Sequence, residues 1–421
     1  MSGAGTGNFG IERTRLPSGL RVLTESMPEL RSVAIGFWVG TGAVDEPDHL
    51  LGASHFLEHL LFKGTDTLAA SEIAHAIESV GGDMNAFTTQ EYTAFYVRVP
   101  DDQLEAATNI LSAVVWSPAF RRHDVDSERQ VILEEIRMRD DTPDDIVHEL
   151  FASALYPKHP LGRSVLGSPE TIAAADRDAI AEYHHDHYRP RNVVVAAAGN
   201  LEHQRMVDLI SAGLGVEDGA RPARIDPSFA PPDAVLGERR PTEQAHMVLG
   251  VRAIARDDPD RYALSVVNQA LGGGMSSRLF QEIREKRGLA YSVYSYRVAF
   301  DGTGALGIYA GTNPERAHET LAVIRGELDR LVADGMPESE LAAAKGHLKG
   351  STALSLETSS SRMHRLGRSE LTTDDVPSVD ELVAEIEAVT VEDADRVIKR
   401  VFADEARVLA VVGPFDAEDF A

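Results

Sequence analysis

Apolar and polar positions along the chain follow two rhythms, one typical of strands and one typical of helices. Runs that are apolar throughout, or that alternate with a period of two, predict strands at residues 31–40, 87–99 and 192–198. Patterns of helical type predict helices at residues 69–80, 104–115 and 124–138. Because both kinds of element alternate, we expect layers of sheet and helix, and therefore an α/β or α+β fold.

The second half of the chain repeats the order of the first in a weaker form. Strands are predicted at residues 245–252, 292–298 and 305–310, and helices at 260–271, 315–334 and 337–354. Between the halves, residues 215–241 carry five prolines among glycines and charged residues, a composition typical of a linker. We therefore predict two similar domains, 1–215 and 242–421, joined by a linker at 216–241.

One segment of the first half carries the strongest chemical signal. His55 and His59 are four residues apart in an apolar stretch, so on a helix both imidazoles lie on one face and can bind one metal ion. Glu58 lies on the same side, where its carboxylate could hold a water. This H-x-x-E-H pattern is the inverted form of the H-E-x-x-H helix of zinc proteases. The alternative is a structural histidine pair, but such polar groups are costly to bury without a function.

A hydrolytic zinc usually has three protein ligands, so a third is expected on another element. The predicted helix 124–138 is the strongest candidate. Glu128 and Glu135 are seven residues, or two turns, apart and share a face of this helix. Glu134 is turned away from that face, so we predict Glu135 as the ligand and Glu128 as its companion behind it. For this segment taken alone, solvated surface carboxylates are the simpler interpretation.

His55-x-x-Glu58-His59, followed by Glu128 and then Glu135, resembles the zinc signature of the pitrilysin, insulysin and mitochondrial processing peptidase superfamily. The resemblance implies one Zn²⁺ per chain, bound by His55, His59 and Glu135. It also implies that Glu58 is the general base, which takes a proton from water and returns it to the leaving amine. Glu128 matches the earlier acidic residue of the family.

The second half adds to the resemblance. Arg284 and Tyr291 are similar to an Arg and Tyr pair that holds substrate near the metal in this family. The resemblance implies that they donate hydrogen bonds to the substrate carbonyl or to the developing oxyanion. Without it, Arg284 would be interpreted as a surface charge and Tyr291 as a strand aromatic. Residues 263–270, the counterpart of the metal helix, contain no His or acidic residue, so the second domain cannot bind zinc in the same way.

Substrate is expected to bind along one strand of the first domain. Asn85, Ala86, Phe87 and Thr88 are predicted to lie on an edge strand that pairs with an extended peptide through main-chain hydrogen bonds. The segments that flank the motif, residues 62–65 and 81–88, also match the family. We therefore predict peptides as substrates.

The resemblance also implies an architecture and an activity. The expected fold is α+β, with two similar domains in a clamshell arrangement, each a mostly antiparallel sheet packed against helices. Family members of this length commonly form homodimers around an enclosed cavity, with the Arg and Tyr near each zinc supplied by the partner subunit. The predicted function is that of a zinc-dependent endopeptidase. The alternative is a catalytically silent relative that acts as an assembly or chaperone-like subunit, but such relatives lose part of a motif that is complete here.

Composition narrows the remaining choices. The 421 residues include no cysteine, which excludes disulfides, a thiolate nucleophile and cysteine-bound metal. A net charge of −26 argues against nucleic acid as a partner, because nucleic-acid binding depends on basic patches. The acidity favours solubility, and a sharper hypothesis is an acidic chamber that attracts basic peptides. The chain begins with a polar segment and has no apolar run of ~18–20 residues, so we expect no signal peptide, no membrane span and a cytoplasmic location.

Three further features indicate structure rather than chemistry. The run Gly272–Ser277 lacks the Lys-Ser/Thr of a P-loop and is expected to end one helix and start the next. The histidines at 184, 185 and 187 are expected at a helix end, where cationic imidazoles suit the helix dipole. His75 and His148 are expected to be ordinary structural or surface residues.

Overall fold

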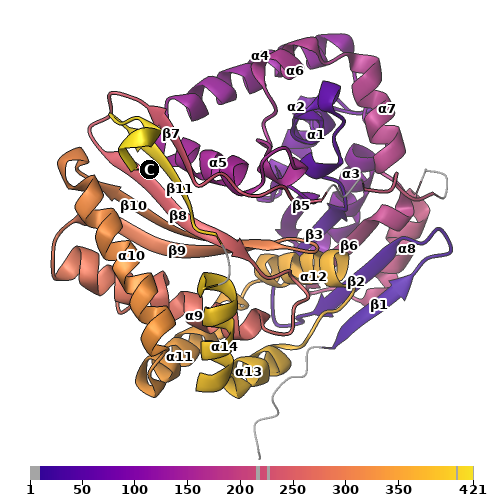
Figure 1. Ribbon diagram of the computed structural model, residues 1–421. Helices are drawn as coiled ribbons and strands as arrows, with labels where there is room; N and C mark the ends of the chain where they lie inside the picture. The colour runs from indigo at the N-terminus through magenta and orange to yellow at the C-terminus, as the bar shows by residue number, and fades with distance from the viewer. Residues whose placement is uncertain (1–9, 215–218, 225–227, 404–405, 421) are drawn as a thin grey trace, which may run out of the picture. The chain divides into compact units, whose positions relative to one another are not determined.

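Two β-sheets organise the computed structural model, which describes residues 10–214, 219–224, 228–403 and 406–420 (Figure 1). The first sheet consists of β1 (Ile11–Arg15), β2 (Arg21–Ser26), β3 (Ser32–Val39), β4 (Asp83–Thr88), β5 (Thr93–Pro100) and β6 (Val193–Gly199) in the order β1-β2-β6-β3-β5-β4. The second consists of β7 (Val235–Arg239), β8 (Ala245–Ala253), β9 (Ala290–Ala299), β10 (Gly304–Thr312) and β11 (Val408–Gly413) in the order β7-β11-β8-β10-β9. Each has one parallel pair, β2 with β6 and β7 with β11. The remaining pairs are antiparallel, so the predicted α+β class is confirmed.

Helices accompany each sheet. Those that belong wholly or mainly with the first sheet are α1 (Ala53–Leu61), α2 (Ala70–Glu78), α3 (Leu104–Trp116), α4 (Arg122–Asp140), α6 (Pro169–Ala174), α7 (Arg177–His187), α8 (His203–Gly213) and α12 (Ser359–Thr373). Those of the second are α5 (Pro143–Leu155), α9 (Arg261–Gly272), α10 (Ala317–Asp334), α11 (Glu338–Ser355), α13 (Val379–Ala388) and α14 (Val391–Ile398). Short 3₁₀ and π turns connect several of them, including the π-helical turn η6 (Phe280–Glu285). In the described residues, no helix is long and apolar enough to cross a membrane.

The chain divides into two units, and each contains a segment from the other half of the sequence. Unit 1 comprises Met1–Ile136, Ser164–Asp226 and Ser355–Val376, and unit 2 comprises Arg137–Arg163, Pro227–Leu354 and Pro377–Ala421. Helix α5 therefore packs on β11 and β8. Helix α12 packs on β6 and β3, and Figure 1 shows this yellow-orange helix beside the purple β3 and the magenta β6. The predicted ranges 1–215 and 242–421 are continuous in sequence and did not include this exchange.

Helix α12 approaches its sheet closely because one of its residues has no side chain. A Cβ atom on Gly367 would lie 2.0 Å from the indole nitrogen of Trp38 on β3, so only glycine allows this contact. Met363 and Leu366 are buried beside it against the same face of the sheet. Ion pairs of Arg362 with Glu25 and of Arg13 with Glu370 hold the helix to β2 and β1.

Two predictions of local structure were wrong. The run 87–99 is not one strand, because a turn at 89–92 separates β4 from β5. The Thr89 hydroxyl donates to the carbonyl of Tyr92 at 2.8 Å and accepts from its amide at 3.1 Å, which closes the turn. The linker 216–241 is shorter than predicted, because Val235–Arg239 forms β7; residues 216–218 and 225–227 of the linker lie outside the described residues.

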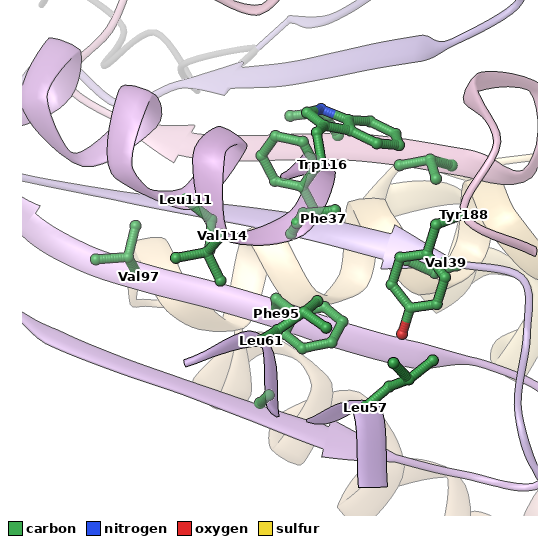
Figure 2. Close-up of a cluster of buried hydrophobic side chains, with 14 of the residues drawn as sticks. Phe37, Val39, Leu57, Leu61, Phe95, Val97, Leu111, Val114, Trp116 and Tyr188 are labelled. Atoms are coloured by element: carbon green, nitrogen blue, oxygen red, sulfur yellow. The ribbon is translucent and has the colours of Figure 1, made fainter. Parts of the chain in front are cut away.

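The core of unit 1 fixes one face of α1. Leu57 and Leu61 are fully buried, and they lie near Phe95 of β5 in the cluster that Figure 2 shows. Above them, the ring of Phe37 on β3 meets the indole of Trp116 on α3 edge to face, with ring centres 6.0 Å apart. The opposite side of α1 carries His55, Glu58 and His59, which are three and four residues apart and therefore share one face.

Candidate metal centre

Three side chains of ligand type converge where α1 and α4 meet in unit 1. The Nε2 atoms of His55 and His59 lie 3.7 Å and 3.5 Å from the same oxygen of Glu135, its Oε2. In the described residues this is the one group of His, Cys, Asp or Glu side chains found close enough to hold a metal ion. The structure therefore brings together the three predicted ligands, although Glu135 follows His59 by 76 residues in the sequence.

The donor set fits a divalent ion better than it fits hydrogen bonding. Glu135 Oε2 is buried and has no hydrogen-bond partner among the described residues, although two imidazole nitrogens face it. Burial, with a smaller effect of His59, lowers the pKa of His55 to about 4, so His55 is neutral at pH 7 and forms no ion pair with Glu135. Ligands 2.0–2.2 Å from a tetrahedral Zn²⁺ lie ~3.3 Å apart, close to the separations found here.

A second carboxylate orients one of the imidazoles. Glu128, which is buried, accepts from Nδ1 of His59 through its Oε2 at 3.1 Å. With Nδ1 as the donor, Nε2 of His59 is the ring nitrogen that faces Glu135, as a metal ligand requires. The other oxygen of Glu128 lies 2.7 Å from Nζ of Lys63, a residue that sequence reasoning did not identify. Lys63 lies in the turn after α1, four residues beyond His59, so helical spacing alone does not predict this contact.

Glu58 lies on the same face of α1 and is held from the sheet. The Thr88 hydroxyl, at the end of β4, donates to Oε2 of Glu58 at 2.7 Å. Burial raises the pKa of Glu58 above its ordinary value, and the Thr88 hydroxyl opposes that effect. A carboxylate whose pKa is raised towards neutrality is suited to taking and returning a proton.

The start of α1 is anchored by a buried acid that sequence reasoning missed. Glu46 accepts from the backbone amides of Gly52 at 2.6 Å and Ser54 at 2.7 Å, and so caps a helix whose N-cap residue has no side chain. Burial raises the pKa of Glu46 to about 8. Gly52 has φ = +91°, and a Cβ there would lie 2.6 Å from a methyl group of Ile172. An isolated acid in a loop gives no pattern from which this role could be predicted.

The predicted substrate strand lies at the edge of its sheet, as expected, with one side of β4 unpaired among the described strands. Asn85 is exposed, and Ala86 is buried on the side that faces the core. The Phe87 ring packs against Trp38 at 5.7 Å between centres, and Thr88 is committed to Glu58. The substrate role of these four residues stays a prediction.

Arg284 and Tyr291 lie together in unit 2. The guanidinium of Arg284, on η6, lies over the ring of Tyr291, at the start of β9, 4.5 Å from its centre. Tyr291 is 80% exposed, so it is not the half-buried strand aromatic that its sequence alone would indicate. Both side chains are therefore presented by a cation–π contact at the surface of their own unit.

The other histidines singled out in the sequence take no part in the metal centre, although two of them differ from the prediction. The histidines at 184, 185 and 187 do end a helix, α7, but His184 is buried against the carbonyl of Val115 at 2.9 Å. Burial lowers the pKa of His184 to about 4 and also lowers that of His187, so the prediction of cationic imidazoles was wrong for these two. His148 on α5 hydrogen-bonds Tyr296 of β9 at 2.9 Å, and His75 is exposed.

Comparisons with known proteins match both halves of the chain to one peptidase family. Residues 21–169 match the family model described as insulinase (peptidase family M16), and residues 174–348 match the one described as peptidase M16 inactive domain. All three candidate ligands and Glu58 lie in the first match. The word "inactive" therefore applies to a segment that contains none of them.

Relatives extend over nearly the whole chain. A protein of Streptomyces coelicolor named as an uncharacterized zinc protease is 44% identical over 416 residues, covering 96% of this chain and 90% of the relative. One of Bacillus subtilis with the same description is 39% identical over 405 residues, covering 96% and 98%.

Solved structures show the same fold. A Pseudomonas fluorescens structure described as a peptidase M16 inactive domain has a TM-score of 0.90 at 23% identity and covers 97% of this chain and 98% of its own. A Helicobacter pylori protease also has a TM-score of 0.90 at 23% identity, with coverage of 96% and 99%. Sequence relatives and both family models together establish that this chain belongs to the insulinase (M16) family of zinc proteases.

Proposed function

We propose that this protein is a zinc-dependent endopeptidase that hydrolyses peptides or unfolded segments. The observation that carries the proposal is the buried Oε2 of Glu135, which faces the Nε2 atoms of both His55 and His59 without a hydrogen-bond partner among the described residues. Two imidazoles and one carboxylate are a common ligand set of hydrolytic zinc, in which a fourth position is left for water. Mn²⁺ or Co²⁺ could occupy such a site in vitro.

The side chains around the ligands suit peptide hydrolysis. A bound Zn²⁺ would polarise the scissile carbonyl and lower the pKa of a coordinated water towards ~7. Glu58 takes a proton from the attacking water and delivers it to the leaving amine, a role that its raised pKa favours. Glu128 keeps His59 in the tautomer that leaves Nε2 free, and Lys63 compensates the charge of Glu128.

The edge strand β4 supplies the substrate contacts. An extended peptide that pairs with β4 would use the main-chain groups beside Asn85 and Ala86, at the strand whose last residue, Thr88, contacts Glu58. Arg284 and Tyr291 are proposed to hydrogen-bond the substrate carbonyl or the oxyanion. We further propose that the protein is a homodimer and that this pair acts on the metal centre of the partner subunit.

Glu58→Gln tests the proposal. The variant keeps the size of the side chain but removes the base, so we expect zinc to be retained and peptide turnover to fall roughly 10²–10⁴-fold. Zinc is measured by elemental analysis, and turnover with a library of quenched fluorescent peptides. Glu78→Gln on α2, an exposed position, is the matched control and should behave like the wild type.

Two outcomes would count against the proposal. Equal turnover by Glu58→Gln and the wild type would exclude Glu58 as the base. A wild-type protein that binds zinc but cleaves no peptide of the library would favour the silent, chaperone-like alternative. Because the motif is complete, the lack of activity would then have a cause other than a lost motif residue. The cleaved positions in the library would also show whether basic peptides are preferred.

A further inference from the structure

Thr88 was expected to contact substrate, but its side chain is used inside the protein. Its hydroxyl lies 2.7 Å from Oε2 of Glu58, a length typical of a strong hydrogen bond from a hydroxyl to a carboxylate. The same hydroxyl lies 3.5 Å from the carbonyl of Ser54, one turn earlier on α1. Thr88 is thus the point at which the edge of the sheet meets the polar face of the metal helix.

The donor is held rigidly. Thr88 pairs with Thr93 of β5 across the hairpin, and Thr93 is fully buried with its hydroxyl bonded to the carbonyl of Thr41 at 3.0 Å. The turn that follows is closed by the Thr89 hydroxyl, which contacts both the carbonyl and the amide of Tyr92. A β-branched side chain on such a backbone has little torsional freedom at χ1.

The acceptor needs such a partner. Glu58 has flexible torsions between its backbone and its carboxylate, and α1 fixes only its Cα and Cβ atoms. A proton-transfer group that is displaced by about 1 Å can lose about 10²-fold in rate. One hydrogen bond occupies a single lone-pair direction of a carboxylate that has about four, so Glu58 can still take a proton while Thr88 holds it.

We propose that Thr88 is a positioning residue for the general base: its hydroxyl holds the Glu58 carboxylate in the orientation from which it takes the proton of the attacking water. This inference rests on the proposed endopeptidase function. It removes the side chain of Thr88, although not its main chain, from the groups that contact the peptide.

Four variants test the proposal. Thr88→Val keeps the shape and removes the donor, Thr88→Ser keeps the donor, and Thr88→Val is also made in the Glu58→Gln background. Thr24→Val on β2 is the matched control, because it also removes a threonine hydroxyl that bonds a side chain, that of His203 at 2.8 Å. The measurements are kcat, KM, zinc affinity by chelator competition and thermal midpoint.

Thr88→Val should lower kcat roughly 10–100-fold, with KM and zinc affinity within about two-fold of the wild type. Thr88→Ser should recover kcat to within about three-fold, and Thr24→Val should lower only the thermal midpoint. In the Glu58→Gln background, Thr88→Val should change kcat by less than about two-fold, because the group it orients is absent.

The proposal is overturned if Thr88→Val leaves kcat unchanged, if it loses zinc, or if its effect is equally large without Glu58. Each of these results would show that Thr88 does not position Glu58, while the proposed function stands. If Glu58→Gln alone retains full activity, the proposed base fails and the inference fails with it, so the two failures are distinguishable.

Discussion

Unit 1 and unit 2 arrange strands in the same order around a central strand, β3 in one and β8 in the other. Each central strand is followed by a helix, α1 or α9, and then by a hairpin whose first strand, β4 or β9, lies at the edge of the sheet. Each sheet also carries one helix from the other half of the chain. That helix places a histidine against a tyrosine of the hairpin, His364 near Tyr96 and His148 near Tyr296.

The two units differ in what the helix after the central strand does with its polar residues. The face of α1 carries His55, Glu58 and His59, whereas α9 contains no His, Asp or Glu. The acids just before and at the start of α9, Asp258 and Asp260, form ion pairs with arginines instead. The repeated scaffold therefore does not bring metal-binding chemistry with it, and that chemistry depends on a few side chains of one copy.

Loss of metal is the largest effect that would test this contrast. Glu135→Gln removes the oxygen that faces both imidazoles, so we expect zinc affinity to fall by ~10²-fold or more, whereas Glu128→Gln, which acts only through His59, should lower it by about 10-fold. Chelator competition and zinc content after dialysis measure both values. Glu134→Gln, the neighbouring position on the outer face of α4, is the matched control. A loss of zinc in Glu134→Gln as large as in Glu135→Gln would show that the ligand set is wrong.

The role proposed for unit 2 predicts the next largest effect. Arg284→Ala and Tyr291→Phe should lower kcat/KM by roughly 10²-fold, because each removes a donor to the reacting carbonyl, and neither should change zinc affinity. The assay is the quenched-peptide assay, with zinc content measured in parallel. Arg287→Ala, three residues further on and also half exposed, is the control for loss of charge in this segment.

Mixing two inactive variants shows which subunit supplies the pair. If Arg284 acts on the metal centre of the partner subunit, a heterodimer of Glu58→Gln with Arg284→Ala has one site with both groups intact and regains activity. If the pair acts within its own chain, every site in the mixture lacks one group and activity stays low. An active monomer in light scattering would also exclude the dimer proposal.

A smaller effect is expected for the acids that hold the start of α1 and of α9, which are Glu46 and Asp260. At pH 9, above the pKa of about 8, Glu46 is ionised; Glu46→Gln then turns an amide NH₂ towards the backbone N–H of Gly52 or Ser54, and we expect a loss of about 1–3 kcal/mol in stability. It should also weaken zinc binding several-fold, because α1 carries two ligands. Asp260→Asn, which weakens ion pairs at the start of α9, should lower stability without changing zinc affinity. Denaturant unfolding and chelator competition compare the two variants, and an equal effect on zinc would remove the distinction between the anchors.

Much of the fold could be predicted because its elements have strong local patterns. The apolar runs of β3 and β6, and the helical patterns of α2, α3, α9 and α10, lie within a few residues of the predicted bounds. The hairpin of β4 and β5 was missed because the hydrophobic pattern continues across the turn at Thr89, whose closing contacts are made by a hydroxyl. The exchange of α5 and α12 depends on contacts more than a hundred residues apart, such as Gly367 with Trp38, and these leave no local signal.

In the candidate site, too, some contacts could be predicted from local sequence patterns and others could not. Helical spacing places His55, Glu58 and His59 on one face, and it also brings Glu128 and Glu135 together. The contact of Thr88 with Glu58 and the role of Glu46 could not be predicted, because a threonine in a strand and an acid in a loop make such contacts only when another element reaches them. Sequence periodicity describes one element at a time, whereas these contacts join two.

The smallest expected effect concerns how the free energy of unfolding depends on pH. We expect the two units to differ in the stability that they lose below neutral pH. His184 in unit 1 has a pKa lowered to about 4 by burial, so its folded form binds fewer protons than its unfolded form between about pH 6.5 and 4. The stability that neutral His184 contributes is therefore complete above pH 6.5 and is lost as the pH falls towards 4. His184→Gln keeps a donor for the carbonyl of Val115 but does not titrate, so its stability should fall less between pH 7 and 5 than that of the wild type. The matched variant in unit 2 is His246→Gln, because burial also lowers the pKa of His246 but Asp144 opposes that shift. Denaturant unfolding at pH 7 and pH 5 measures the loss in free energy of unfolding between the two pH values. We expect His246→Gln to change this loss less than His184→Gln does. An equal change in both variants would mean that the units do not differ in acid sensitivity.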